Sequence, residues 1–192
     1  MMDLLRQLEE YRPFNEQEER DRNIIIRCLK EEKDIFTRDN AMAHMTASAW
    51  VVNRQRTKVL MAYHNIYQSW SWLGGHADGE QDLLQVAVRE VKEESGLKQV
   101  RPVSDAVYSL EILTVDGHVK KGAYVPSHLH LNVTYLLEAE EGEGLHIKED
   151  ENSGVAWFLP GDAVLASTEP WMRERVYRKL NEKINRNERI NL

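Results

Sequence analysis

Residues 72–97 read W-L-G-G-H-A-D-G-E-Q-D-L-L-Q-V-A-V-R-E-V-K-E-E-S-G-L, and this stretch decides the fold. It predicts the end of a strand, a glycine loop and one short helix. Asp82 is a suitable N-cap, and Gln85 three residues later completes a capping box. Gly96 ends the helix, since glycine favours the position just past a helical C-terminus. Apolar residues recur between these signals at helical spacing, namely Leu83, Leu84, Ala87, Val88 and Val91.

The opposite face of this helix carries three acids. Glu90 lies three residues before Glu93 and four before Glu94, so the carboxylates crowd one side of the helix. Like charges at this spacing repel, and Arg89, which can pair with Glu93, cannot neutralise all three. A hard divalent cation such as Mg²⁺ can, because it prefers oxygen ligands. A solvated acidic face is the alternative, and the glycine loop at 74–75 favours the metal site.

This loop and helix together resemble the Nudix box, whose pattern is G-x5-E-x7-R-E-U-x-E-E-x-G-U, with U an aliphatic residue. The residues that occupy its positions in register are Gly75, Arg89, Glu90, Val91, Glu93, Glu94, Gly96 and Leu97. One position departs, because Gln81 stands where the family has its first glutamate, with Glu80 beside it. In the family this acid mostly supports the loop and the arginine, so we expect activity to survive the change.

The resemblance implies the fold of that family, an α/β/α sandwich of the α/β (α+β) class with a mixed β-sheet. We expect residues 43–192 to form the Nudix hydrolase domain, with a C-terminal helix that begins after Ser167 or Thr168. Residues 1–42 are expected to form an N-terminal helical extension packed on this core. Amphipathic patterns predict its two helices at residues 3–11 and 16–36.

Strands are predicted from period-two alternation and from runs of β-branched and aromatic residues. The predicted strands are residues 44–52, 58–63, 106–114, 128–138 and 155–159, of which the first two form a hairpin. A polar loop is expected between the third and fourth of them, with Asp116-Gly117 as its turn.

Carried over position by position, the resemblance makes Glu93 and Glu94 the main ligands of Mg²⁺ or Mn²⁺. It makes Glu90 a further ligand or the general base, and Arg89 the group that orients a carboxylate. The backbone carbonyl of Gly75 would complete the metal shell. The catalytic residues implied in this way are Glu90, Glu93 and Arg89.

A further acid is expected from the loop that precedes Trp157. In Nudix proteins a glutamate just before a strand containing tryptophan often adds a metal ligand or a catalytic base. Glu151 is the first candidate for this role and Glu149 is the second. An ordinary acidic loop is the alternative.

Substrate contacts are predicted at Trp72, Lys121, His128 and His130. Trp72 is either a core aromatic residue or a group that stacks on a base, and Lys121 either meets phosphates or lies in a solvated loop. The two histidines share one face of an alternating strand. They either hydrogen-bond a substrate or belong to a polar strand face turned to water. A zinc site is not expected, because the sequence lacks the spaced Cys or His partners of a dependable one.

Net charge, apolar content and the number of cysteines limit the partners and the location that we expect for the protein. A net charge of −7 gives no general attraction for nucleic acid, and it repels a polyphosphate unless a cation lies between. No apolar run approaches the length of a membrane span, and we do not expect the acidic N-terminus to be a secretory signal. The single cysteine, Cys28, cannot form an internal disulfide, which suits a reducing cytoplasm. The apolar stripe of the N-terminal helices suggests a homodimer, although a monomer is compatible with it.

We therefore expect a cytoplasmic, metal-dependent hydrolase that cleaves the pyrophosphate bond of a nucleoside diphosphate linked to another moiety. Its partner is that small molecule, with neither a nucleic-acid polymer nor a membrane involved.

Two alternatives remain open. A non-catalytic nucleotide-binding or regulatory Nudix domain is favoured where box acids are lost, and here the helix acids are intact. The other alternative is an enzyme like isopentenyl diphosphate isomerase, which shares the Nudix fold. Its chemistry resembles that of a proton-transfer site made of a Cys and a Glu. Cys28 lies on a predicted helix far in sequence from the box.

Overall fold

The structure is a computed structural model that describes residues 2–120 and 122–190. Within these residues, no helix is both long and apolar enough to cross a membrane. The chain divides into two compact units. Unit 1 comprises residues 1–48, 74–87 and 105–135, and unit 2 comprises residues 49–73, 88–104 and 136–192.

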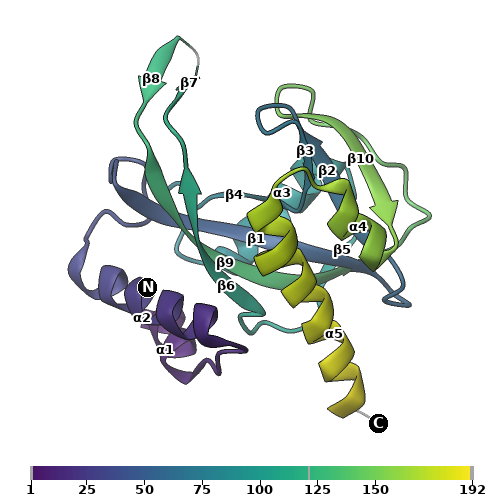
Figure 1. Cartoon of the computed structure of the whole chain (residues 1–192), viewed down its shortest axis with the longest axis horizontal. Coiled ribbons are helices and arrows are strands. Elements are labelled where there is room, and N and C mark those ends of the chain that lie inside the picture. Colours follow the sequence, from purple (N-terminus) through teal and green to yellow (C-terminus); the bar gives the residue numbers. More distant parts are fainter. Residues whose placement is uncertain (1, 121, 191–192) are drawn as a thin grey trace. The chain divides into compact units, whose positions relative to one another are not determined.

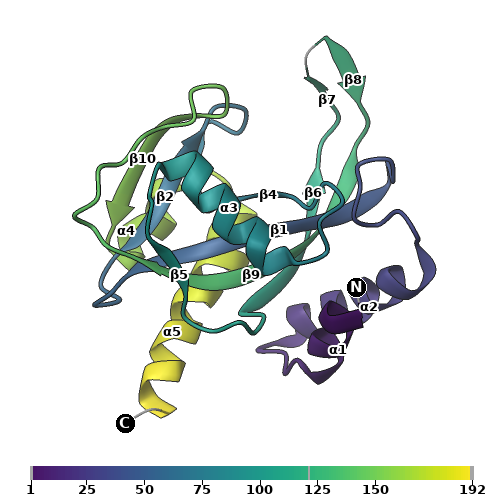
Figure 2. The ribbon, with the colours of Figure 1, turned by 180° about the vertical axis from the view of Figure 1, so that it is seen from behind.

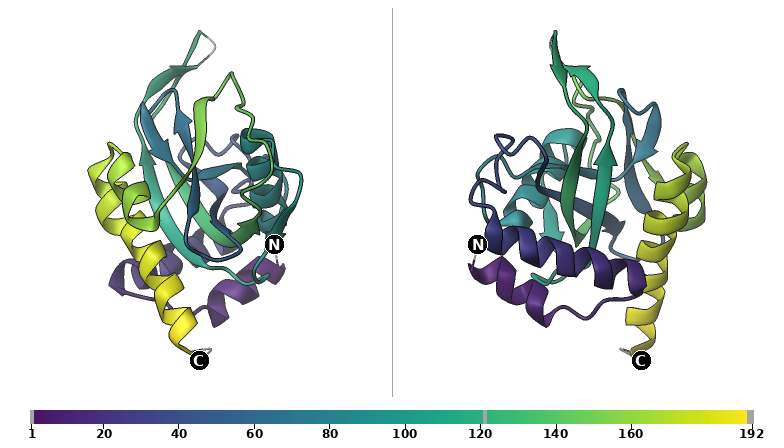
Figure 3. Two further views of the ribbon diagram at one scale, coloured as in Figure 1. Left: turned by 90° about the vertical axis from the view of Figure 1, so that its right-hand side faces the viewer. Right: turned by 60° about the vertical axis from the view of Figure 1, so that its left-hand side comes forward.

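Unit 1 combines two N-terminal helices with antiparallel strand pairs. Its elements are α1 (Met2–Glu10), α2 (Glu16–Glu31), the first part of β1 (Ala43–Asn53), β4 (Leu73–His76), β6 (Ser109–Val115), β7 (His118–Lys120), β8 (Ala123–Val125) and most of β9 (His128–Ala139). The helices α1 and α2 lie side by side, and α2 packs against β6 (Figures 1 and 3). β6 pairs with β9 along its whole length, and β4 pairs with β1.

The predicted start of α2 is confirmed, but its predicted end is wrong. The side chain of Asn15 accepts a hydrogen bond from the backbone N–H of Glu18, so Asn15 is the N-cap. The helix ends at Glu31 rather than near residue 36, because Glu32 has an extended backbone conformation. The carbonyl of Ile35 then accepts a hydrogen bond from the N–H of Met45 at the start of β1, 2.7 Å away. Ile35 is still buried, which explains why it fits the apolar pattern.

A buried carboxylate connects α2 with β6. Glu18 is fully buried, and it accepts hydrogen bonds from the Tyr11 hydroxyl, the Phe14 backbone N–H and the Ser109 hydroxyl, at 2.6, 2.7 and 2.9 Å. A buried charge of this kind is tolerated only where hydrogen bonds surround it. Residues of the N-terminal helices therefore have specific polar partners on a strand that lies about 90 residues later in the chain.

The central part of the polar face of β9 is buried. The alternative that this face is turned to water is therefore wrong for the central residues of the strand. Asn132 and Thr134 are fully buried and donate hydrogen bonds to the carboxylate of Glu111. Asn132 also accepts hydrogen bonds from the hydroxyls of Thr46 and Ser48 on β1. The alternation of polar and apolar residues in this strand reflects two different buried surroundings.

The segment expected to be a polar loop forms a β-hairpin instead. Strand β7 pairs with β8, with Val119 opposite Tyr124, and Figure 2 shows the hairpin extending away from β6 and β9. The turn contains Gly122 at a φ of +82°, a conformation that glycine adopts without steric strain. The sequence indicated a turn at Asp116-Gly117, which is where the chain enters the hairpin rather than where it reverses.

Unit 2 contains the remaining strands and the C-terminal helices. Its elements are the second part of β1, β2 (Val59–His64), β3 (Ser69–Ser71), β5 (Val100–Pro102), the end of β9, β10 (Asn152–Phe158), α4 (Pro160–Ala166), a π-helix η1 (Met172–Tyr177) and α5 (Arg178–Ile190). The strand order is β10-β2-β1-β9-β5, and β3 pairs with β2. The predicted hairpin of β1 and β2 is confirmed, with Val51 opposite Leu60.

The C-terminal helix of the prediction is present with two differences. It begins as the π-helix η1 and continues as α5, and Val176, Leu180 and Ile184 bury one side of it. The short helix α4 was not predicted; it begins at Pro160, because proline is tolerated at a first helical position. The fully buried rings of Trp50 and Tyr177 stack with their centroids 5.5 Å apart and join η1 to β1.

The box helix α3 (Leu83–Ser95) is one continuous helix (Figure 2) and ends as the sequence predicts. Gly96 has a φ of +72°, and its N–H donates to the carbonyl of Lys92. A β-carbon at position 96 would lie only 2.8 Å from the β-carbon of His146. Glycine is therefore required here both for the backbone conformation and for the close approach of the chain at His146.

We expect Gly96→Ala to lower the free energy of unfolding by about 1–3 kcal/mol, because alanine is strained in the left-handed region and clashes with His146. Urea denaturation followed by circular dichroism measures the loss. Gly142→Ala is the matched control, since no atom lies within 4 Å of a β-carbon built there. Equal stabilities of the two variants would contradict this account of Gly96.

Candidate functional site

The acidic helix α3 is positioned by local signals at its start. The carboxylate of Asp82 accepts hydrogen bonds from the backbone N–H and the side-chain amide of Gln85, at 3.1 and 3.0 Å. The predicted N-cap Asp82 is thus confirmed, and it satisfies an N–H group that the first turn leaves without a helical partner. The reciprocal half of the predicted capping box is wrong, because the N–H of Asp82 donates to Glu80 instead of to the side chain of Gln85. The register of the three acids follows from this start.

The three acids of α3 differ in exposure. Glu94 is buried, the side chain of Glu90 is 13% exposed, and that of Glu93 is 49% exposed. The guanidinium of Arg89 lies 3.0 Å from Glu90 Oε1. Arg89 therefore pairs with its neighbour Glu90 rather than with Glu93, the partner that helical spacing suggested.

Lys148 brings a second acid to this helix. Its ammonium nitrogen lies 3.6 Å from Glu93 Oε2 and 2.9 Å from Glu151 Oε2. A tight turn holds Lys148 and Glu151 together, since the N–H groups of Glu151 and Asn152 both donate to the carbonyl of Lys148. Glu151, the first candidate of the sequence, thus shares a cation with a box acid, whereas Glu149 is exposed.

The charge of Lys148 is stabilised by these acids. Burial by itself disfavours the ammonium, but the hydrogen bond and charge of Glu151 and the charges of Glu90 and Glu93 outweigh burial and raise the pKa of Lys148. The sequence prediction missed this lysine. The signal that indicates it is the spacing Lys148-x-x-Glu151, which places both side chains on one side of a turn.

In the loop before α3, the acid Glu80 is hydrogen-bonded to the backbone of the same loop. The carboxylate of Glu80 accepts hydrogen bonds from the backbone N–H groups of Gln81 and Asp82, at 2.7 and 2.9 Å. Gln81 itself is exposed. Glu80 therefore supports the loop backbone from the position next to Gln81, the residue that departs from the family pattern. Gly75, the first glycine of the box, lies within β4.

The residues predicted to contact substrate have different surroundings. Trp72 is half-buried between β3 and β4, where its backbone N–H donates to the Tyr177 hydroxyl and its ring lies edge-on to the Tyr177 ring. Lys121 lies outside the described residues. His128 and His130 meet His44 and His76 in one cluster, which the sequence did not indicate because the two additional residues lie far away in the chain.

Two histidines of this cluster have a lowered pKa. Burial, followed by the neighbouring charges of His76, His44 and His128, lowers the pKa of His130 to about 2. Burial also lowers the pKa of His44. A neutral imidazole offers a lone pair rather than positive charge, so these two rings are not suited to attract phosphate.

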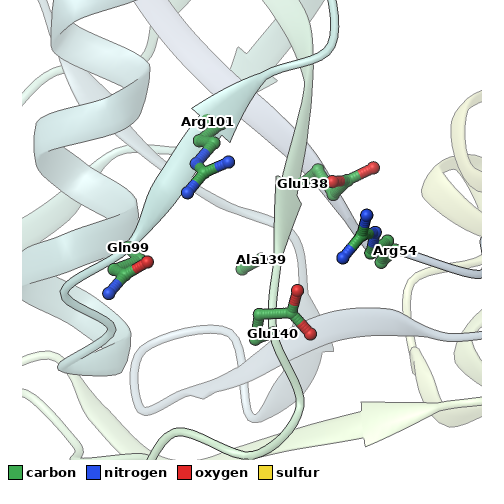
Figure 4. A pocket seen from close by; sticks show the side chains of 6 residues that line it. All are labelled: Arg54, Gln99, Arg101, Glu138, Ala139 and Glu140. Carbon is green, nitrogen blue, oxygen red and sulfur yellow. The ribbon is translucent and has the colours of Figure 1, made fainter.

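A small pocket in unit 2 lies apart from these predicted residues. Figure 4 shows its lining side chains, which are Arg54, Gln99, Arg101, Glu138, Ala139 and Glu140. Its volume of about 150 Å³ is below the roughly 300–1,000 Å³ of typical ligand pockets. None of the predicted site residues lines it, so it does not define the substrate site.

The chain matches the family model of the NUDIX domain over residues 42–180. Because this match spans well over half of the chain, the protein belongs to the Nudix family. It is a Nudix hydrolase, an enzyme class that acts on acid anhydrides in phosphorus-containing compounds, generally with divalent metal ions. No curated protein matches the chain.

Solved structures show the same fold at low sequence identity. An Ap4A hydrolase from C. elegans, in a binary complex, is 19% identical with a TM-score of 0.55, covering 76% of this chain and 97% of its own. The dihydroneopterin triphosphate pyrophosphohydrolase of E. coli is 14% identical with a TM-score of 0.53, covering 73% and 95%. The Nudix hydrolase RenU of M. smegmatis is 15% identical with a TM-score of 0.51, covering 77% and 86%. At such identities the likeness shows the fold alone, and that fold is the mixed α and β class expected from the sequence.

We expect Lys148→Met to tighten Mn²⁺ binding about fivefold, on the order of 1 kcal/mol, because the variant removes a cation from between Glu93 and Glu151. Titration calorimetry measures the affinity. Lys92→Met is the matched control, since this exposed lysine of α3 changes the net charge equally. An affinity for Mn²⁺ that stays constant or falls in Lys148→Met would show that the ammonium does not occupy the metal position.

Proposed function

We propose that the protein is a Mg²⁺- or Mn²⁺-dependent hydrolase that splits the pyrophosphate bond of a nucleoside diphosphate linked to another moiety. The observation that carries this proposal is the gathering of acids around one cation: Glu93 and Glu151 both pair with Lys148, and Glu90 adds its charge. Carboxylates that already gather around an ammonium have the charge and the oxygen atoms that a divalent ion requires.

The acids present fit such an ion. The set contains one buried, one nearly buried and two partly exposed carboxylates, namely Glu94, Glu90, Glu93 and Glu151. When bound, Mg²⁺ or Mn²⁺ would neutralise the diphosphate oxygens and lower the pKa of a bound water. In the proposed assignment Glu93, Glu94 and Glu151 would hold the ion, and the role of the Gly75 carbonyl stays a prediction of the sequence.

The remaining steps use side chains of the box. Water attacks one phosphorus of the diphosphate, the bridging P–O bond breaks, and the two products are phosphate monoesters. Glu90 takes up the proton of the attacking water or adds a further ligand. Arg89, paired with Glu90, restrains the orientation of that carboxylate.

We also propose that residues 1–42 form an extension of a hydrolase domain made by residues 43–192. The hydrogen bonds of Glu18 with Ser109 and of Tyr11 with the carbonyl of Tyr108 support this division, because they connect the extension to β6. Trp72, His128, His130 and Lys121 stay predictions for substrate contacts.

The two alternative functions have less support. A regulatory domain without turnover has no need of the complete acid set of α3. An isomerase that uses a cysteine would have to rely on Cys28, the single cysteine of the chain. Burial raises the pKa of the Cys28 thiol in α2, so the residue behaves as a half-buried apolar side chain.

We expect the double variant Glu93→Gln, Glu94→Gln to lose at least about 100-fold in turnover, or 2.7 kcal/mol of transition-state stabilisation. The assay follows phosphate monoester release with Mg²⁺ or Mn²⁺ from a panel that includes ADP-ribose, Ap4A and dihydroneopterin triphosphate. Glu138→Gln, Glu140→Gln removes two charges elsewhere in unit 2 and serves as the control. Turnover that is equal in both double variants would exclude the assigned site.

We expect Glu151→Gln to reduce turnover by about tenfold or more, and Glu149→Gln to leave it within about twofold, because only Glu151 shares Lys148 with Glu93. The two substitutions lie in one loop and remove the same charge, so the pair forms its own control. Steady-state kinetics on the best substrate of the panel provides the comparison, and the reverse order of effects would assign the loop acid to Glu149.

A further inference from the structure

Four of the seven histidines of the chain meet in one place in unit 1. They are His44 on β1, His76 on β4, and His128 and His130 on β9. One ring nitrogen from each lies within 4.8 Å of all the others. The centroids of the contacting rings are 4.8–5.1 Å apart.

Two of these rings are oriented by backbone carbonyls. The Nδ1 atom of His44 lies 3.0 Å from the carbonyl oxygen of Asn40, and the Nδ1 atom of His128 lies 2.8 Å from that of Pro126. A carbonyl oxygen only accepts, so each Nδ1 carries the hydrogen and donates it. In a neutral ring the Nε2 atom then has a free lone pair. A hydrogen bond from the second ring nitrogen to a carbonyl oxygen typically orients a metal-binding histidine.

One acceptor in the cluster lacks a partner. His44 is buried, and its Nε2 atom has no hydrogen bond to any described residue. A buried acceptor without a partner is destabilising, so it calls for an explanation. The Nε2 atoms of His128 and His130 lie 3.1 Å apart, and a hydrogen bond between them would leave His44 Nε2 still unsatisfied.

A metal ion bound by all four rings would satisfy these lone pairs together. With Zn–N bonds of about 2.0–2.1 Å, the nitrogens of a tetrahedral site lie about 3.4 Å apart. The spacing of His128 and His130 is close to this value, and modest side-chain rotation would contract the wider pairs, which are at most 4.8 Å apart.

We propose that His44, His76, His128 and His130 form a site for one divalent transition-metal ion, with Zn²⁺ as the first candidate. Among the described residues, this group is made of imidazoles alone, and imidazole suits Zn²⁺, Ni²⁺ and Cu²⁺. Mg²⁺ prefers oxygen ligands and belongs with the carboxylates of α3. Four protein ligands leave no open position, so the ion is structural and ties β4 to β1 and β9. His76 directly follows Gly75, so the ion also restrains the first residues of the box.

Metal analysis of the full-length chain, prepared without an affinity tag, tests this site. After removal of metal with a chelator, we expect one equivalent of Zn²⁺ to bind in competition with a chromophoric chelator, and excess Mg²⁺ not to displace it. Co²⁺ in its place should give the strong visible absorption of tetrahedral coordination. Zn²⁺ should also raise the melting temperature.

His44→Ala and His128→Gln should each weaken Zn²⁺ binding at least about 100-fold and abolish the increase in melting temperature. His118→Gln is the control, because this half-buried histidine lies near His128, with ring centroids 6.5 Å apart, and is not a member of the cluster. If both cluster variants fail to fold, the stoichiometry and Co²⁺ spectrum of the unmodified chain decide.

Two results would overturn the proposal. One is a chain that binds less than about a tenth of an equivalent of Zn²⁺ and gives no tetrahedral Co²⁺ spectrum, which would make the cluster a packing arrangement only. The other is Zn²⁺ binding that persists in His128→Gln but is lost in Glu93→Gln, Glu94→Gln, which would place the ion on the box acids. Neither result depends on turnover, so the outcome is independent of the proposed hydrolase activity.

Discussion

Carboxylates that crowd one face of a helix require positive charge nearby, and this requirement organises the acidic site of unit 2. The ammonium of Lys148 meets it by pairing with Glu93 on α3 and with Glu151 in the turn just before β10. The loop that carries Lys148 is thereby tied to the acidic helix by charge. A second connection lies at the end of the helix, where the N–H of His146 donates to the carbonyl of Ser95 and Gly96 allows the close approach. A backbone hydrogen bond and ion pairs thus hold the loop before β10 against α3. This contact brings an acid of the loop, Glu151, to the acids of the box.

Unit 1 follows a different rule, which is the satisfaction of buried polar groups. Glu18 has three hydrogen-bond donors, and Asn132 both donates to Glu111 and accepts from two hydroxyls of β1. These groups are well satisfied although they are fully buried. The buried Nε2 atom of His44 differs from them within the same unit, because it has no hydrogen-bond partner among the described residues although three other imidazoles surround it. This contrast makes the histidine cluster stand out from an ordinary polar core.

Features that depend on a few neighbouring residues were predicted well. The N-caps Asn15 and Asp82, the glycine stop at position 96 and the hairpin of β1 and β2 all follow from signals within about five residues. The errors arose where distant segments decide the outcome. The second helix is shorter than predicted because the chain after Glu31 pairs with β1 through Ile35 and Met45. The polar face of β9 is buried because Glu111 and two hydroxyls of β1 supply partners that strand periodicity does not reveal.

The sequence alone was enough to indicate the family, the class of fold and the class of reaction. All three follow from the spacing of the residues in one short stretch, from Gly75 to Leu97. Helical geometry converts that spacing directly into a face of carboxylates. Only the tertiary structure decided which loop residues reach those carboxylates and which histidines meet. Lys148 and Glu151 follow the box acids by more than fifty residues, and His44, His76 and His128 are separated by more than thirty residues each. Strand pairing and turns set such distances, and a one-dimensional pattern does not contain them.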